Sequence, residues 1–405
     1  MRETVTLSEF KGLNNVLKPE NTPEDYLKTA ENIDIDKSGN LHKRKGYQLL
    51  DAGKYQSIWA NGKVCYVVKE NTLYSFDGTL TPLAPVSGAL SFTEADGLIY
   101  FASQRETGII ENGIVRTWGI APPNPPTISE TTGILKAGTY QVTYTYSDIN
   151  GLESGSSVAS VITVGDNAGI QVDTVPSIDP RVTDINVYCS TQDGMELFYI
   201  GSNINIVSSI NTASNVLKLF NLYNAPLGSE ITYFKGRIYT VDNSIVWYSE
   251  AQQYEHYNFE TNYLDFDSPV QGLMPVEDGL WIATTNELFF AGGFNPFNLS
   301  LKENVKMVIG TAAKIPADYI GGMGYSWIIT TDEGLFMLAN SGQYKNMTAG
   351  NLALESADNG TGIFVQHDGM NQYMSLIRKT DKPNNAVFGD IISGEIIRNG
   401  VSLPS

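Results

Sequence analysis

The chain is poor in the residues from which disulfide frameworks and metal centres are built. Its 405 residues include 2 cysteines and 3 histidines. Cys65 and Cys189 lie inside β-like runs in different segments, so we expect two buried free thiols rather than a disulfide. The histidines have no second His or Cys at ligand spacing, which argues against a zinc site; they are His42, His256 and His367.

Long apolar runs are also missing. No stretch approaches the roughly 18 apolar residues that suggest a membrane-spanning helix. The opening residues MRETVTLSEF lack the apolar centre of a secretion signal, so we expect no cleaved signal.

Positive charge is scarce, with 26 basic against 44 acidic residues and a net charge of −18. A general attraction to nucleic acid is therefore not expected. Eight of the basic residues lie with eight acidic ones in the first 50 residues, so the remainder carries the whole net charge. The chain is 42% hydrophobic with 38 Gly, and short runs of Val, Ile, Tyr and Thr recur. This composition predicts an all-β globular class.

A short unit repeats along the chain, and its clearest copy is YFKGRIYTVDNSIVWYS from Tyr233 to Ser249. Two β-rich runs flank a polar break, which predicts a strand, a tight turn and a second strand. A polar-Gly pair precedes five of six copies, and Met323-Gly324 precedes the other one. The marker glycines are Gly62, Gly97, Gly236, Gly279, Gly324 and Gly369. Their spacings of 35, 43, 45 and 45 residues match the period of a β-propeller blade. Six copies predict about six blades.

One interval of 139 residues, between Gly97 and Gly236, is too long for a blade. Within it the second blade ends at about Ile120, and the stiff linker Pro122–Pro126 follows. After the linker, YQVTYTY alternates as a half-buried strand should. Further short strands follow at sandwich-like spacing. We therefore expect an all-β fold in which residues 51–121 and 227–405 form a propeller of about six blades. A fibronectin type III-like β-sandwich is expected at 122–226.

Residues 1–50 differ from the rest and are expected to form a docking segment. Thr22 followed by Pro23, Glu24 and Asp25 has the form of a short helix start. Lys43, Arg44 and Lys45 are the only basic run. Such a run indicates either a solvated loop or a contact with an acidic neighbour or DNA phosphates, and we take the assembly contact as the candidate site.

Catalytic, cofactor and metal motifs are not found. Asp34, Asp36, Ser38 and Gly39 resemble the start of a calcium loop, but His42 and Lys45 stand where later oxygen ligands belong, so a side-chain-capped turn is favoured. No G-x-S-x-G, Walker or G-x-G-x-x-G sequence is present. Two acidic pairs at turns leave a glycosidase formally open, because carboxylate separation is not readable from sequence; they are Glu277-Asp278 and Asp332-Glu333. We predict no enzymatic role and no cofactor.

Several segments resemble a known family. EFKGLNN, a Pro-Glu-Asp stretch and AENIDID before SGNLHKRKGY are similar to the head of bacteriophage virion proteins. GTYQVTYTYSDINGLESGSS is similar to their fibronectin-like insertions, and FKGRIYTVDNSIVWYSEA and PVEDGLWIATTNELFFAGG to their propeller strands. The likeness covers nearly the whole chain and points to the nozzle protein of short-tailed phage tails.

The resemblance implies a structural role in the virion. Nozzle subunits, usually six, form a ring below the portal and adaptor, through which double-stranded DNA passes without sequence-specific binding. It also implies synthesis in the bacterial cytoplasm and contacts with other tail proteins. An acidic lumen would repel phosphates and agrees with rapid DNA release. The alternative is a propeller-based carbohydrate-binding or hydrolytic receptor-binding tail protein.

Overall fold

The structure is a computed structural model that describes residues 9–30, 33–36, 38–43, 51–293, 296–319, 324–352, 354, 357–367, 370–379, 395–398 and 401–404. The described chain is all-β. Its helices are three short 3-10 turns: η1 (Pro19–Asn21), η2 (Ala317–Tyr319) and η3 (Asn340–Gly342). None of the helices in the described part of the chain is long enough to cross a membrane.

Six antiparallel sheets follow one another along the chain, each built of consecutive strands in order. We call them meanders 1 to 6. Meander 1 contains β5 (Tyr55–Ala60), β6 (Cys65–Lys69), β7 (Thr72–Phe76) and β8 (Leu80–Pro85). Meander 2 contains β9 (Ser91–Ala95), β10 (Leu98–Ala102), β11 (Thr107–Glu111) and β12 (Ile114–Arg116). Meander 3 contains β21 (Glu230–Phe234), β22 (Arg237–Asp242), β23 (Ile245–Glu250) and β24 (Gln253–Asn258), with β20 (Leu222–Tyr223) on β24 and β25 (Tyr263–Asp265) on β23.

The remaining meanders lie in the C-terminal half. Meander 4 contains β26 (Val270–Pro275), β27 (Gly279–Thr284), β28 (Leu288–Gly292) and β29 (Leu299–Glu303). Meander 5 contains β30 (Ala313–Ile315), β31 (Ser326–Thr331), β32 (Gly334–Leu338) and β33 (Tyr344–Asn346). Meander 6 contains β34 (Ala357–His367), β35 (Met370–Lys379), β36 (Glu395–Arg398) and β37 (Val401–Pro404).

The marker glycines lie where the repeat predicts, at the step from the first to the second strand of a meander. Gly97 and Gly236 follow residues that also have positive φ, at 48° for Asp96 and 44° for Lys235. Two consecutive positive φ values form the tight hairpin turn that matches strand twist, and glycine takes up the second position without strain. Gly369 lies outside the described residues.

Neighbouring meanders share apolar cores and are also joined along their first strands. Phe92, Ile99 and Phe101 of meander 2 pack with Tyr66 and Val68 of meander 1, for example. Full burial of such side chains contributes about 1.5–3 kcal/mol each. Four side chains on first strands also accept hydrogen bonds from backbone N–H groups in the first strand of the next meander or directly before it. The bonds are Ser57 Oγ from Leu90 (3.1 Å), Ser91 Oγ from Ile231 (3.0 Å), Thr93 Oγ1 from Tyr233 (2.9 Å) and Glu230 Oε1 from Leu273 (3.0 Å).

The segment between meanders 2 and 3 folds as two sheets around one core. The four-stranded sheet has the order β15 (Ser160–Val164), β14 (Gly138–Asp148), β17 (Val182–Ser190), β18 (Leu197–Ser202). The three-stranded sheet has the order β13 (Thr127–Leu135), β16 (Ala168–Asp173), β19 (Ile206–Val207). Tyr144 and Val187 from one sheet meet Ile170 and Val172 from the other in the buried core. We call this two-sheet unit the sandwich.

The prediction of a short helix that begins at Thr22 is wrong. The Thr22 hydroxyl donates backwards to the Lys18 carbonyl (3.0 Å), at the end of η1, and so caps no following turn. The Tyr26 N–H bonds to the Pro23 carbonyl (3.0 Å), which closes a single turn. The chain then enters β2 (Tyr26–Leu27), which pairs in parallel with β1 (Gly12–Leu13). So few residues cannot offset the cost of starting a helix.

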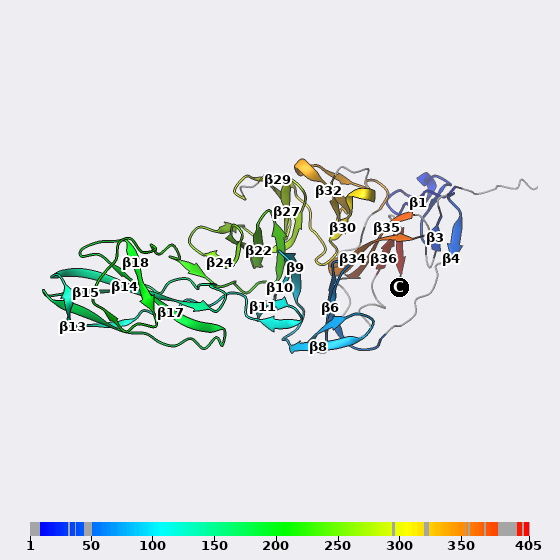
Figure 1. The fold of residues 1–405 in the computed structure, drawn as a ribbon. Helices are drawn as coiled ribbons and strands as arrows, with labels where there is room; N and C mark the ends of the chain where they lie inside the picture. The colour runs from blue at the N-terminus through cyan, green and yellow to red at the C-terminus, as the bar shows by residue number, and fades with distance from the viewer. Residues whose placement is uncertain are drawn as a thin grey trace, which may run out of the picture.

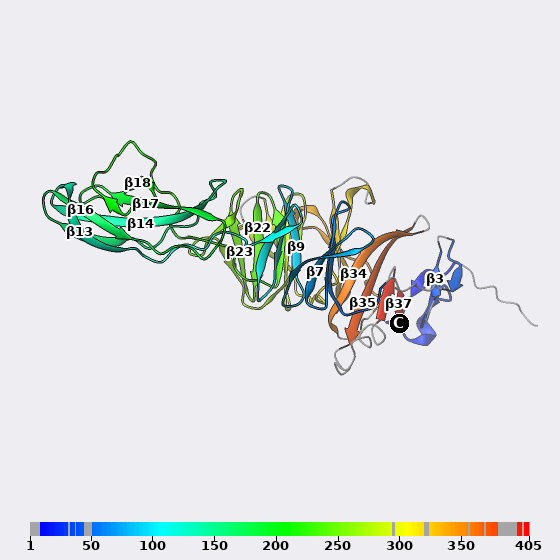
Figure 2. The same ribbon diagram turned by 60° about the horizontal axis from the view of Figure 1, so that its bottom comes forward.

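The molecule is elongated (Figures 1 and 2). The sandwich extends from one end of the stacked meanders, and the hairpin of β3 (Ile33–Ile35) and β4 (Leu41–Lys43) lies at the opposite end in both views. The chain therefore presents two separate ends to its surroundings.

Candidate functional site

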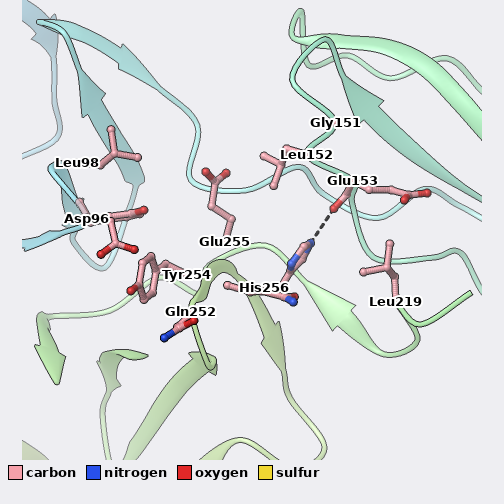
Figure 3. A pocket seen from close by; sticks show the side chains of 12 residues that line it. Asp96, Leu98, Gly151, Leu152, Glu153, Leu219, Gln252, Tyr254, Glu255 and His256 are labelled. Atoms are coloured by element: carbon pink, nitrogen blue, oxygen red, sulfur yellow. Dashed lines mark hydrogen bonds between the residues drawn. The ribbon is translucent and has the colours of Figure 1, made fainter. Parts of the chain in front are cut away.

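The contact between the sandwich and meanders 2 and 3, which we call the neck, holds a cleft. It has a volume of about 500 Å³. We call the six meanders together the body. Figure 3 shows Asp96 and Leu98 from the body facing Leu152 and Glu153 from the sandwich, with Glu255 between them. The cleft thus lies where two folding units meet.

Glu255 on β24 is the central charge of the neck, and its side chain is 11% exposed. Arg116 from meander 2 binds it with both terminal nitrogens, at 2.9 and 3.1 Å. Arg181 from the sandwich approaches the same carboxylate at 3.9 Å. The Gly119 N–H also donates to it, at 3.0 Å. A single body carboxylate therefore lies between a body cation and a sandwich cation.

Arg181 also holds the segment that follows β12 and leads from meander 2 to the sandwich. Its Nη2 donates to Thr117 Oγ1 (2.5 Å) and to the Gly119 carbonyl (3.1 Å). Asp179 binds both Arg181 (2.9 Å) and the Thr117 hydroxyl (2.9 Å). Burial alone would raise the pKa of the Asp179 carboxyl, but the hydrogen bonds from Arg181 and Thr117 bring it below its ordinary value. Asp179 is therefore held as the anion.

A second crossing point joins His256 of the body to the sandwich. His256 Nε2 lies 2.7 Å from the Glu153 carbonyl oxygen (Figure 3). A carbonyl oxygen can only accept, so this nitrogen carries the proton. The Glu153 carboxylate turns back into the sandwich, where it accepts from Tyr188 (2.8 Å), Asn186 (3.1 Å) and Thr145.

Close backbone packing completes the neck. A side-chain carbon added at Gly155 would lie 1.7 Å from the Leu222 carbonyl oxygen. Leu222 belongs to β20, which pairs with β24 of meander 3, so the sandwich loop rests directly on a body strand. With its carboxylates engaged in ion pairs and hydrogen bonds, the neck is built to fix the orientation of the sandwich.

The predicted contact residues lie at the other end of the molecule. Lys43 ends β4 and is exposed; Arg44 and Lys45 lie outside the described residues. The three residues of β4 are all exposed, while those of β3 are half-buried.

The turn between β3 and β4 confirms the side-chain cap that the sequence favours. Asp36 accepts from the backbone of Ser38 (2.8 Å) and Asn40 (2.9 Å), and from His42 Nε2 (2.9 Å). These bonds, led by that from Asn40, hold the pKa of the Asp36 carboxyl far below its usual range. In the part of the chain that the structure describes, no three His, Cys, Asp or Glu side chains are arranged to hold a metal ion.

The remaining predicted residues are dispersed. Cys65 and Cys189 are both free thiols, as expected; Cys189 is buried and Cys65 half-buried. His42 and His256 lie in the hairpin turn and the neck, while the side chain of His367 is outside the described part. The neck ion pairs have no sequence signal beyond isolated charges, because Arg116, Arg181 and Glu255 come from three different elements.

Comparison with known proteins leaves the family open. No protein-family model and no curated protein sequence matches the chain. Among solved structures, the extracellular domain of a hybrid two-component system from B. thetaiotaomicron is similar at 10% identity and a TM-score of 0.31. The alignment covers 86% of this chain but only 38% of that one.

Two further solved structures are similar at the same low level. KlHsv2 with an engineered loop matches at 9% identity and a TM-score of 0.30, over 85% of this chain and 92% of that one. PorZ, a surface component of the type-IX secretion system of Porphyromonas gingivalis, matches at 10% identity and a TM-score of 0.24, over 90% of this chain and 55% of that one.

Proposed function

We propose that this chain is a structural protein of a bacteriophage tail, a ring-forming nozzle or connector through which the genome is retained and ejected. Its six meanders would close into a six-bladed propeller, and the sandwich would be of the fibronectin type III kind. The observation that carries the proposal is the two-ended shape: a projecting sandwich fixed by a buried neck, and an exposed hairpin opposite it (Figures 1 and 2). The phage-like sequence of that hairpin end supports the same assignment.

The hairpin end suits an assembly contact. An isolated two-stranded hairpin is at best marginally stable in water. Among the described residues, β3 and β4 pair with each other and with no further strand, and β4 is exposed along its length. Leu41 is 37% exposed there, beside Lys43. We propose that Lys43, Arg44 and Lys45 contact an adjacent subunit of a six-membered ring or the adaptor above it.

Charge supports this arrangement. Bodies that carry the whole net charge of −18 repel one another, whereas the first 50 residues are neutral and contain the basic run. Exposed ion pairs contribute about 0.2–1 kcal/mol each, so the run would adjust assembly rather than create it. An acidic body would also allow DNA to pass without binding tightly.

The test is to change Lys43, Arg44 and Lys45 together to Ser and to count, by electron microscopy, the tails that acquire the protein. We expect fewer occupied tails at low salt and a smaller difference near 1 M salt, where the Debye length is about 3 Å. The matched control changes three exposed lysines elsewhere, Lys54, Lys63 and Lys218, and should leave incorporation unchanged. If the triple variant and the wild type enter tails equally at low salt, the basic run is a solvated loop. If the wild type forms no rings and does not bind tails, the assignment as a structural tail protein is wrong.

A further inference from the structure

A row of four aromatic rings, which we call the aromatic row, lies at the outer side of meander 3. Tyr223 stacks on Phe259 with ring centres 5.1 Å apart and planes 12° apart. Phe259 meets Trp247 edge-on at 4.9 Å, and Trp247 meets Tyr263 at 5.6 Å. Tyr223 and Tyr263, at the two ends, are each 40% exposed. Trp247 and Phe259 pack inward against the core shared by meanders 2 and 3.

The loop that inserts Phe259 into the row is held by its own polar side chains. The Glu260 N–H bonds to Asn258 Oδ1 (3.0 Å), and Asn262 Nδ2 donates to Glu250 Oε1 (2.8 Å). Asn221, next to Tyr223, donates to Glu260 Oε2 (2.8 Å). Tyr223 lies on β20 and Tyr263 on β25, on either side of this loop. A core needs only the two inner rings, so the two exposed tyrosines form a preorganised surface rather than packing.

The polar groups at the surface of the row are hydroxyls, an amide and a carboxylate. Neither the Tyr223 nor the Tyr263 hydroxyl bonds to any described residue, and Glu260 is exposed. Residues 220–267 contain seven acidic and two basic residues, so phosphates and other anions would be repelled. A compact cation would need rings that enclose it, whereas these rings form a row with open ends.

We propose that the aromatic row binds a neutral carbohydrate chain. The electron-rich faces of Tyr223 and Tyr263 attract the polarised C–H groups of sugar rings. Asn221, Glu260 and the two phenol groups supply donors and acceptors for sugar hydroxyls, which do both. This site does not depend on the tail assignment, because it rests on meander 3 alone.

The experiment uses the full chain and three probes: linear oligomers of glucose, of galactose and of N-acetylglucosamine. Binding is followed by titration calorimetry and by Trp fluorescence, since Trp247 lies in the row. We expect a Kd of about 1 mM or tighter for at least one oligomer. Tyr223→Ala and Tyr263→Ala should each weaken it about tenfold, as loss of one stacking ring does for other stacked ligands. Tyr55→Ala is the matched control, because Tyr55 is 36% exposed but belongs to meander 1 rather than to the aromatic row. This variant should bind the oligomers normally.

Thermal melting separates binding from folding, because removal of partly exposed rings should leave the melting temperature nearly unchanged. No binding of the three oligomers by the wild type overturns the proposal. Undiminished binding by the Tyr223→Ala/Tyr263→Ala variant also overturns it. If that variant instead fails to enter tails and the wild type binds no sugar, the row is a protein contact and the carbohydrate assignment is wrong.

Discussion

The neck and the hairpin β3–β4 both depend on one carboxylate, but in different surroundings. Glu255 in the neck is nearly enclosed and binds two arginines from separate elements. Asp36 in the hairpin is reached by water and binds groups within six residues of itself. Removal of the Glu255 charge leaves its buried partners with unsatisfied hydrogen-bonding groups. The partners of Asp36 can instead form hydrogen bonds to water when its charge is removed. The sandwich is therefore joined to the meanders by enclosed charges, whereas the bonds of Asp36 stay within the hairpin.

The largest loss of folding stability is expected when a side chain is added at the close backbone contact in the neck. Gly155→Ala places a methyl group 1.7 Å from the Leu222 carbonyl oxygen, so backbone must move. We expect about 3 kcal/mol of lost stability in urea unfolding. Gly165→Ala is the control, because its new carbon would lie 3.5 Å from the nearest atom, in ordinary contact. Equal behaviour of the two variants would show that the sandwich does not rest on β20.

The half-buried carboxyl of Glu230, at the start of β21, extends the comparison to pH. Burial raises the pKa of Glu230 to about 7, partly opposed by the bond from Leu273. The folded state then holds a proton that the unfolded state loses near 4.5, so stability falls as pH rises from about 4.5 to 7. The fall should reach about 2–3 kcal/mol, and Glu230→Gln should remove this pH dependence. Parallel pH profiles for wild type and variant would contradict the assignment.

Loss of the neck charge comes next. Glu255→Gln keeps the shape but removes the carboxylate that Arg116 and Arg181 share, so that Arg116 keeps only Glu111 and Arg181 only Asp179. This loss should cost about 2 kcal/mol in urea unfolding. Glu111→Gln is the matched control. The Glu111 side chain binds the same Arg116 at 2.9 Å but is 45% exposed, so we expect its loss to lower the free energy of unfolding by less than about 0.5 kcal/mol. A control as costly as the test would place the energy in Arg116 alone, not in the neck.

The smallest effect is expected at the hairpin. Because the Asp36 pKa lies far below 3.8 in the folded hairpin, its stabilisation is complete above that pH and is lost as pH falls towards the folded value. Asp36→Asn should speed amide hydrogen exchange at Ser38 and Asn40 without moving the urea midpoint of the whole protein. A lowered midpoint would mean that the hairpin is part of the cooperative body.

Local sequence predicted much of this architecture. Asp-Gly and Lys-Gly pairs between β-rich runs specify hairpins because few other residues accept two positive φ values in succession. The alternation in YQVTYTY specifies β14, but the prediction that only one face is buried is wrong. Thr143 and Thr145, on the polar face, are buried as well and form hydrogen bonds to Ser157 and Glu153. The capped turn at Asp36 was predictable for the same reason: its bonds are all local. At Thr22 the helix signal failed because pairing of β1 with β2 outweighed a weak local preference.

The sequence by itself determined an all-β chain and a repeated hairpin, because strand and turn preferences depend on residues near in the chain. Only the tertiary structure decided that Arg116, Arg181 and Glu255 meet, that Ser91 and Thr93 join meander 2 to meander 3, and that Tyr223 stacks on Phe259. These partners lie between 36 and 140 residues apart, and no local pattern encodes their pairing. The physical reason is that isolated charges and rings gain a partner only when folding brings distant elements together, whereas turn and strand preferences act within a few residues.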